Sequence, residues 1–108
     1  MTEQTNVNEM LAGREARYGS FEGHAEISQH LKGVILKYEA KRGCDLDPDQ
    51  REALEMIAHK IARILNGDPN YADNWIDIAG YATLVANRLE IGHNAHITQK
   101  HTISKEAT

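Results

Sequence analysis

The sequence predicts an all-α protein, a helical bundle of about four helices that assembles into oligomers. Glycine and proline residues divide the chain into four helix-length segments, within which apolar residues recur every three or four positions. No alternating apolar and polar run of useful length is present, so strands are not expected. At 108 residues the chain has the length of one domain. We expect a single helical domain over residues 1–90 and a polar C-terminal tail over residues 91–108.

The first two predicted helices each end at a glycine. The first covers residues 6–18 and stops before Gly19, because glycine readily adopts the left-handed conformation that closes many helices. The second begins at residue 20 or 21, ends at residue 42 and is followed by Gly43. Its apolar residues recur at helical spacing, whereas His24 is expected on its polar face.

The third predicted helix, residues 48–66, has the clearest boundaries. Asp47 can cap it, Pro48 suits its first position, and Gln50 stands where the partner of a capping box belongs. One apolar stripe should face the core, formed by Leu54, Ile57, Ala58, Ile61 and Leu65.

The fourth predicted helix follows the turn GDPNYAD, whose Asp73 can cap it, and ends near Glu90, before Gly92. Apolar or weakly polar side chains cover two of its sides. They are Trp75, Ile78, Ala82, Val85 and Leu89 on one side, and Ile76, Ala79, Thr83 and Ala86 on the other. A thin bundle made by one chain cannot cover that much apolar surface, so we expect a homodimer or homotetramer.

Charge and composition exclude several classes of partner. The net charge is −4 and no long basic block is present, which argues against a nucleic-acid partner. No apolar stretch approaches the ~20 residues of a membrane-spanning helix, and the first residues lack the order of a secretory signal. The lone Cys44 cannot form an intrachain disulfide. We therefore expect a soluble cytoplasmic protein with no membrane partner.

Four acidic residues are candidates for a metal site between the third and fourth helices. Glu52 and Glu55 lie on the polar side of the third helix, and Asp73 and Asp77 are one turn apart on the fourth. If these sides face each other, the four carboxylates converge, and like charges that close need a cation among them. Magnesium is the natural candidate, because it prefers oxygen ligands and commonly binds together with phosphates.

Each of these carboxylates also has a simpler interpretation. Glu52 and Glu55 can belong to a solvated charged face, and Asp73 can act only as a helix cap. Asp77, which lies among apolar neighbours, can be a polar group satisfied inside the protein. The candidate partners for it are Lys60, Arg63 and Tyr81.

The spacing Glu52-x-x-Glu55 followed by Asn74-x-x-Asp77 on successive helices resembles a known pattern, E-x-x-E followed by E-x-x-D. That pattern is typical of the all-α nucleoside triphosphate pyrophosphohydrolases, the MazG-like and dimeric dUTPase-like superfamily. Three sequence segments also resemble a small phage protein family placed near that superfamily. They are ARYGSF, HKIARILNG and DNWIDIAGYATL. The resemblance covers about residues 14–90 and implies a dimer or tetramer of helical bundles, in the host cytoplasm if the protein is phage-encoded.

The resemblance also implies an activity, the Mg²⁺-dependent hydrolysis of a nucleotide with release of pyrophosphate. Acidic residues would hold the metal and activate water, while basic, amide and phenolic groups would contact the nucleotide. The implied metal ligands are Glu52, Glu55, Asp77 and, from a neighbouring position, Asp73. The implied catalytic residues are Glu52 and Glu55. The implied nucleotide contacts are Lys60, Arg63, Asn74 and Tyr81.

The chain departs from that pattern at Asn74, where an acid is expected. An amide oxygen can coordinate magnesium but carries no charge, so either Asp73 substitutes for the acid or metal binding is weakened. One alternative is therefore a non-catalytic sponge that sequesters a nucleotide-derived immune signal. A second alternative is a structural phage accessory protein. The sequence does not separate cleavage of a nucleotide from its binding.

Overall fold

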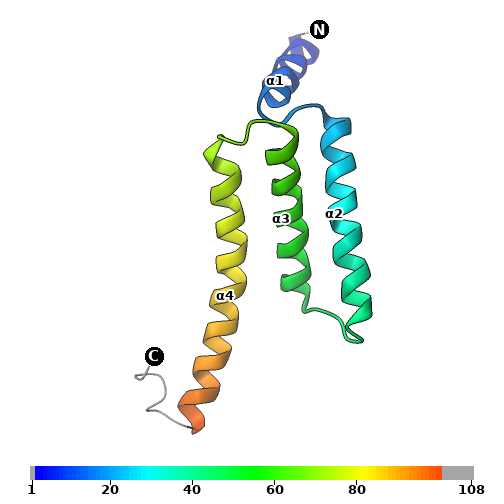
Figure 1. The fold of residues 1–108 in the computed structure, drawn as a ribbon. Coiled ribbons are helices and arrows are strands. Elements are labelled where there is room, and N and C mark those ends of the chain that lie inside the picture. Colours follow the sequence, from blue (N-terminus) through cyan, green and yellow to red (C-terminus); the bar gives the residue numbers. More distant parts are fainter. Residues whose placement is uncertain (1, 101–108) are drawn as a thin grey trace.

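The computed structural model describes residues 2–100 of the chain, and describes side chains for residues 6–92. Within this range it confirms the all-α prediction, with four helices and no strand (Figure 1). The helices are α1 (Thr2–Tyr18), α2 (Phe21–Lys41), α3 (Pro48–Asn66) and α4 (Ala72–Lys100).

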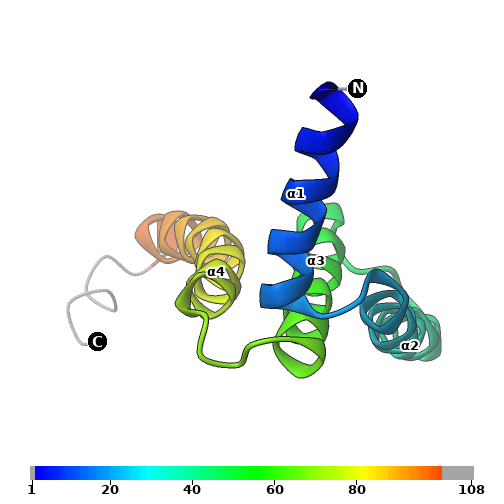
Figure 2. The same cartoon turned by 90° about the horizontal axis from the view of Figure 1, so that it is seen from above.

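Three of the helices form one layer. Helices α2, α3 and α4 lie side by side with alternating direction, and α3 occupies the middle (Figure 1). Helix α1 projects from this layer at the end where α2 begins and α3 ends (Figure 2). The molecule measures 64 × 31 × 26 Å, and its radius of gyration is 19.1 Å. A compact domain of this length would have a radius near ~13 Å, so the chain is open and elongated.

Local signals set most of the helix boundaries as predicted. Gly19 and Gly43 have φ angles of 76° and 85°, the left-handed conformation that was expected after α1 and α2. At the start of α3, the Gln50 side chain accepts a hydrogen bond of 2.9 Å from the backbone N–H of Asp47, which completes the predicted capping box. Helix α1 begins earlier than predicted, at Thr2.

The predicted limits of the fourth helix are wrong at both ends. Helix α4 begins at Ala72, so Asp73 lies in its first turn and does not cap it. The helix also continues through Gly92 to Lys100, although we expected it to end near Glu90. A single glycine inside a helix costs only about 1 kcal/mol relative to alanine, and no proline follows it to force an end. Residues 101–108 of the predicted tail lie outside the described range.

The core of the described chain is small. Its buried apolar residues are three alanines of α3, Ala53, Ala58 and Ala62, which let the neighbouring helices approach closely. Leu54 and Leu65, which were predicted to face the core, are exposed. Of the predicted stripe, Ala58 is buried and the two isoleucines are half-buried. The prediction is wrong for the two leucines, because α3 contacts α2 on one side and α4 on the other and leaves its leucine edge uncovered.

An ion pair between a buried carboxylate and a partly exposed guanidinium joins α2 to α3. Glu39 accepts hydrogen bonds from the Arg51 guanidinium, with N–O distances of 2.7 and 2.9 Å, and from the backbone N–H of Leu46 at 2.8 Å. These donors, Arg51 first and Leu46 second, hold the pKa of Glu39 below its ordinary value. No helix within residues 2–100 is both long enough and apolar enough to cross a bilayer.

Candidate functional site

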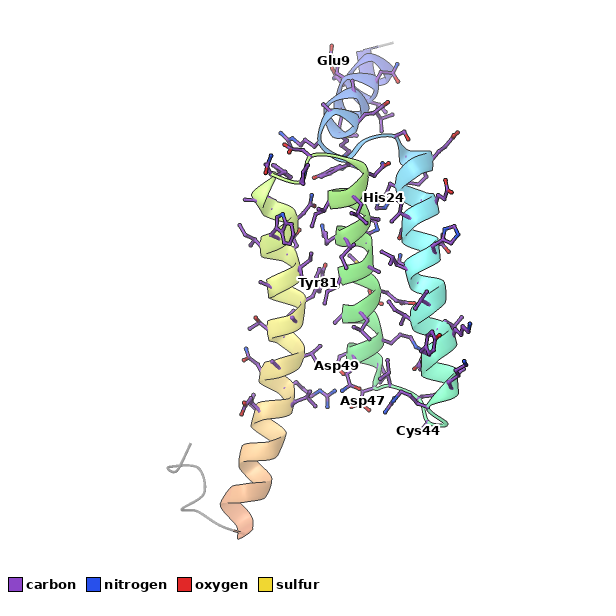
Figure 3. All side chains as sticks on the ribbon, viewed as in Figure 1. Glu9, His24, Cys44, Asp47, Asp49 and Tyr81 are labelled. Carbon is purple, nitrogen blue, oxygen red and sulfur yellow. The ribbon has the colours of Figure 1, made fainter. Side chains whose placement is uncertain are left out.

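The two helices that carry the E-x-x-E and N-x-x-D spacing pack directly on each other. Lys60 of α3 pairs with Asp77 of α4 at 2.9 Å. Further along, Arg88 of α4 bonds to Asp49 at 2.6 Å and to Asp47 at 2.9 Å. Figure 3 shows both aspartates at the start of α3. The helices are antiparallel, so these contacts connect them over most of the length of α3.

The pair between Lys60 and Asp77 explains the carboxylate among apolar neighbours. The Lys60 side chain is 11% exposed, whereas that of Asp77 is 45% exposed. The more deeply buried member is therefore the ammonium, which would be costly without a counter-charge. Asp77 supplies that charge from the adjacent helix. Of the partners considered from the sequence, Lys60 is the one that the structure shows.

The four predicted carboxylates do not converge in the described chain, so this prediction is wrong for the single chain. Asp77 is bound by Lys60, and Asp73 is exposed and accepts a 2.8 Å hydrogen bond from the Tyr71 hydroxyl. Glu52 is exposed and Glu55 half-buried. Among the described residues, no three His, Cys, Asp or Glu side chains are grouped so that they could hold a metal ion.

The rotation of α3 about its axis is the physical reason. Helix α3 turns Lys60 toward α4, and at 3.6 residues per turn Glu55 lies about 140° around the helix from Lys60. The oxygen chemistry of the predicted ligands suits magnesium, but their arrangement in one chain does not. Magnesium binding itself remains a prediction.

Tyr81 and Asn74, the two residues of α4 that were predicted to contact a nucleotide, face the interior of the chain. Tyr81 is half-buried and extends toward α3 (Figure 3). Asn74 is 1% exposed, and its amide nitrogen has no hydrogen-bond partner in the described part of the chain. An orphaned buried amide costs about 1–3 kcal/mol. Asn74 was predicted to contact a nucleotide, but in this arrangement it is covered by protein.

Helix α3 presents different chemistry on the side that faces α1 and α2. Nε2 of His24 and Nδ1 of His59 are 3.3 Å apart, and the two rings meet edge to face with centroids 4.4 Å apart. His24 is 7% exposed, and its Nδ1 has no partner among the described residues. The expectation that His24 lies on a polar face is therefore wrong.

Both imidazoles of this histidine pair are held in the neutral form. Burial, followed by the charges of Arg63 and Lys32, lowers the pKa of His24. Burial, followed by His24 and nearby cations, lowers the pKa of His59 to about 4. At neutral pH the pair is therefore an uncharged hydrogen-bonding unit in a positively charged environment.

Arg63, a predicted phosphate contact, belongs to a row in which two tyrosine rings lie between two guanidinium groups. Its guanidinium carbon lies 4.2 Å from the centre of the Tyr18 ring. Tyr18 meets Tyr71 edge-on at 6.1 Å, and Arg17 lies 5.1 Å from the centre of the Tyr71 ring. Among the side chains of residues 6–92, no carboxylate forms an ion pair with Arg63.

Hydrogen bonds fix this junction of α1, α2 and α3. The Asn66 side chain donates to the backbone carbonyls of Tyr18 and Ser20, each at 2.8 Å. The backbone N–H of Asp68 donates to the carbonyl of Arg17 at 2.7 Å. At Gly67 a Cβ atom would collide with the Arg17 carbonyl, so only glycine permits this close approach.

Comparison with known proteins gives one match. The model of the family described as a domain of unknown function (DUF6378) matches residues 4–89, and the chain belongs to that family. No curated protein and no solved structure matches the chain. The match extends over all the residues that form the junction and the interface between α3 and α4.

Proposed function

We propose that this member of the DUF6378 family is a nucleotide-binding protein that works as a homo-oligomer. The ligand is a nucleotide or a nucleotide-derived small molecule, recognised through its phosphate. The observation that carries the proposal is the state of Arg63, a half-buried guanidinium with no carboxylate partner among the described side chains.

An unpaired guanidinium of this kind indicates an anionic ligand. Its contact with the Tyr18 ring stabilises the charge by about 0.5–2 kcal/mol, and leaves its N–H groups free to bind a ligand. A phosphate satisfies such donors in a bidentate arrangement. Because the whole chain carries a net charge of −4, the attraction for an anion has to be local.

Hydrolysis of the nucleotide is the second candidate, and one observation favours it. The two halves of the motif that resembles the pyrophosphohydrolases lie on α3 and α4, which pack directly on each other. In that case Glu52 and Glu55 would be the catalytic residues, as the resemblance implies. The arrangement of the carboxylates favours binding over hydrolysis, since the part of the chain that the structure describes contains no grouped ligand set for magnesium.

The exposed face of α4 supports assembly with a second copy of the chain. Ile76 and Leu84, one turn before and one turn after Gly80 on the same side of this helix, are both more than half exposed. Gly80 lies between them in sequence, and a Cβ atom placed there would meet nothing within 4 Å. A mid-helix glycine costs about 1 kcal/mol, and the described chain contains no close contact that requires it. Close packing of α4 against another helix, outside this chain, would provide the reason.

One experiment separates the candidate functions. The purified protein is incubated with a panel of nucleoside mono-, di- and triphosphates and cyclic nucleotides, with magnesium or with EDTA, and the mixture is analysed by chromatography. An intact nucleotide retained in both conditions supports the binding function. Magnesium-dependent release of pyrophosphate would establish the hydrolase instead. If nothing is retained or converted, both are refuted and a structural role is left.

A further inference from the structure

A cleft of about 320 Å³ opens at the junction of α1, α2 and α3, and Arg63, one of the predicted nucleotide contacts, lines it. We call it the α1–α3 cleft. Figure 2 shows α1 crossing the end of the layer next to α3 and the start of α2. The lining residues that carry its chemistry are Arg14, Tyr18, Phe21, His24, His59 and Arg63.

The charge of the cleft is opposite in sign to that of the whole chain. Arg14 and Arg63 contribute two guanidinium groups, and Glu15 contributes the one carboxylate of the lining. None of the three forms an ion pair among the described side chains. The ammonium of Lys32 adds to the positive potential at the histidine pair. The cleft therefore attracts an anion.

An orphaned polar atom lies in the wall of the cleft. His24 is buried, its Nε2 is engaged by His59, and its Nδ1 lacks a partner in the described chain. In a neutral pair the shared proton can sit on either ring, so that this Nδ1 can accept or donate a hydrogen bond. A ligand hydroxyl or phosphate oxygen would satisfy it and remove the cost of an unpaired buried group.

An exposed aromatic ring lies at the edge of the cleft. Phe21, the first residue of α2, is 80% exposed, and its ring centre lies 6.3 Å from that of His24. An exposed phenylalanine beside unpaired cations offers a surface on which a flat heterocycle can stack. The volume lies at the lower end of the range of ~300–1,000 Å³ for small-molecule pockets, which suits one nucleotide and excludes a long oligonucleotide.

We propose that the α1–α3 cleft binds a nucleoside monophosphate, or the corresponding part of a larger nucleotide, with its base on Phe21 and its phosphate on Arg63 and Arg14. This inference rests on the proposed nucleotide-binding function and assigns that function a site. Binding in the cleft needs no divalent cation, because the cations that neutralise the phosphate are side chains of the protein.

The test is titration calorimetry of the full chain with AMP, GMP, CMP and UMP in EDTA. Each of Arg63→Gln and Arg14→Gln should weaken binding by about tenfold, the loss expected for a charge-assisted hydrogen bond. Phe21→Ala should weaken it by about threefold or more, and inorganic phosphate should bind more weakly than the best monophosphate. Phe21 and Arg14 are exposed, so these two substitutions leave the fold intact.

Arg17→Gln is the matched control, since Arg17 also stacks on a tyrosine but does not line the cleft. It should change the affinity by less than about twofold. If a nucleotide binds the wild-type chain and the Arg14, Arg63 and Phe21 variants equally, the cleft assignment is overturned while the binding function stands. An equal loss in Arg17→Gln also overturns the assignment. If the wild-type chain binds no nucleotide, the proposed function itself fails.

Discussion

The role of Asp77 can be decided by the substitution Asp77→Asn. The structure makes this carboxylate the counter-charge of Lys60, at 2.9 Å, across the interface between α3 and α4. The amide of asparagine keeps the shape but removes the charge, so a lysine that is 11% exposed loses its neutralising partner. We expect a loss of stability, with no change in how the protein responds to magnesium.

The size of this loss lies between two known limits. Exposed ion pairs contribute about 0.2–1 kcal/mol, and breaking a fully buried pair costs about 3–5 kcal/mol. Lys60 is close to the buried limit, but Asp77 is 45% exposed and solvent screens it. We therefore expect the free energy of unfolding to fall by about 1–2 kcal/mol. For a domain of this size that corresponds to a decrease in Tm of about 5–15 °C.

The assay is urea and thermal unfolding at one fixed protein concentration, because assembly makes apparent stability concentration-dependent. Lys60→Met removes the buried ammonium, so Asp77→Asn should cost much less in that background, with a coupling energy of about 1 kcal/mol. Glu90→Gln, which removes an exposed charge from the same helix, is the control and should have little effect. The reasoning is refuted if Asp77→Asn leaves stability unchanged but abolishes a magnesium-dependent effect of nucleotides.

Three further predictions test the histidine pair, the junction and the assembly. The pKa of His59 is lowered from 6.5 to about 4, so the unfolded chain binds more protons, and stability should be complete above pH 6.5 and fall as the pH drops toward 4. The full difference is about 3 kcal/mol, which partial exposure reduces to about 1–2 kcal/mol. His59→Gln should reduce the change in the free energy of unfolding between pH 6.5 and pH 4.5, measured by urea unfolding at each pH. The same pH dependence in the variant and the wild-type chain would contradict this. Gly67→Ala should lower the free energy of unfolding by about 2 kcal/mol or more, because the added Cβ meets backbone atoms. Gly33→Ala, in open space within α2, is the control and should raise it by about 0.5–1 kcal/mol in the same urea assay. Equal effects of the two substitutions would refute the close approach at Gly67. Gly80→Glu should reduce the particle mass measured by light scattering to that of one chain, and an unchanged mass would exclude this face of α4 from the assembly.

The sequence was sufficient for the features that depend on local chemistry. Four helices, the glycine ends of α1 and α2, and the capping box at Asp47 and Gln50 follow from residues that lie close together in the chain. The end of α4 was missed because Gly92 is only a weak signal without a proline after it. The low helix propensity of this one glycine is not enough to end α4, and the helix continues beyond it.

The candidate site depended on the rotation of α3 about its own axis, which the periodicity of a single helix does not determine. Helix α3 is contacted from two sides, and the rotation that sends Lys60 toward α4 and His59 toward α2 is set by all three helices together. An apolar stripe drawn from α3 alone therefore placed Leu54 and Leu65 inward. A usable signal existed for His24, which stands three residues before Ile27 and so continues the apolar stripe of α2.

The distribution of charge on α3 connects the fold to the choice between binding and hydrolysis. A metal-dependent hydrolase has to turn several carboxylates inward and keep them together until a divalent ion neutralises them. In this chain Lys60 of α3 is buried against α4 and Arg63 is half-buried beside the cleft, whereas Glu52 is exposed and Glu55 is half-buried. Inward cations bind a phosphate directly, and inward carboxylates would repel it. This arrangement of charges therefore supports the proposed capture of a phosphorylated ligand more than its cleavage.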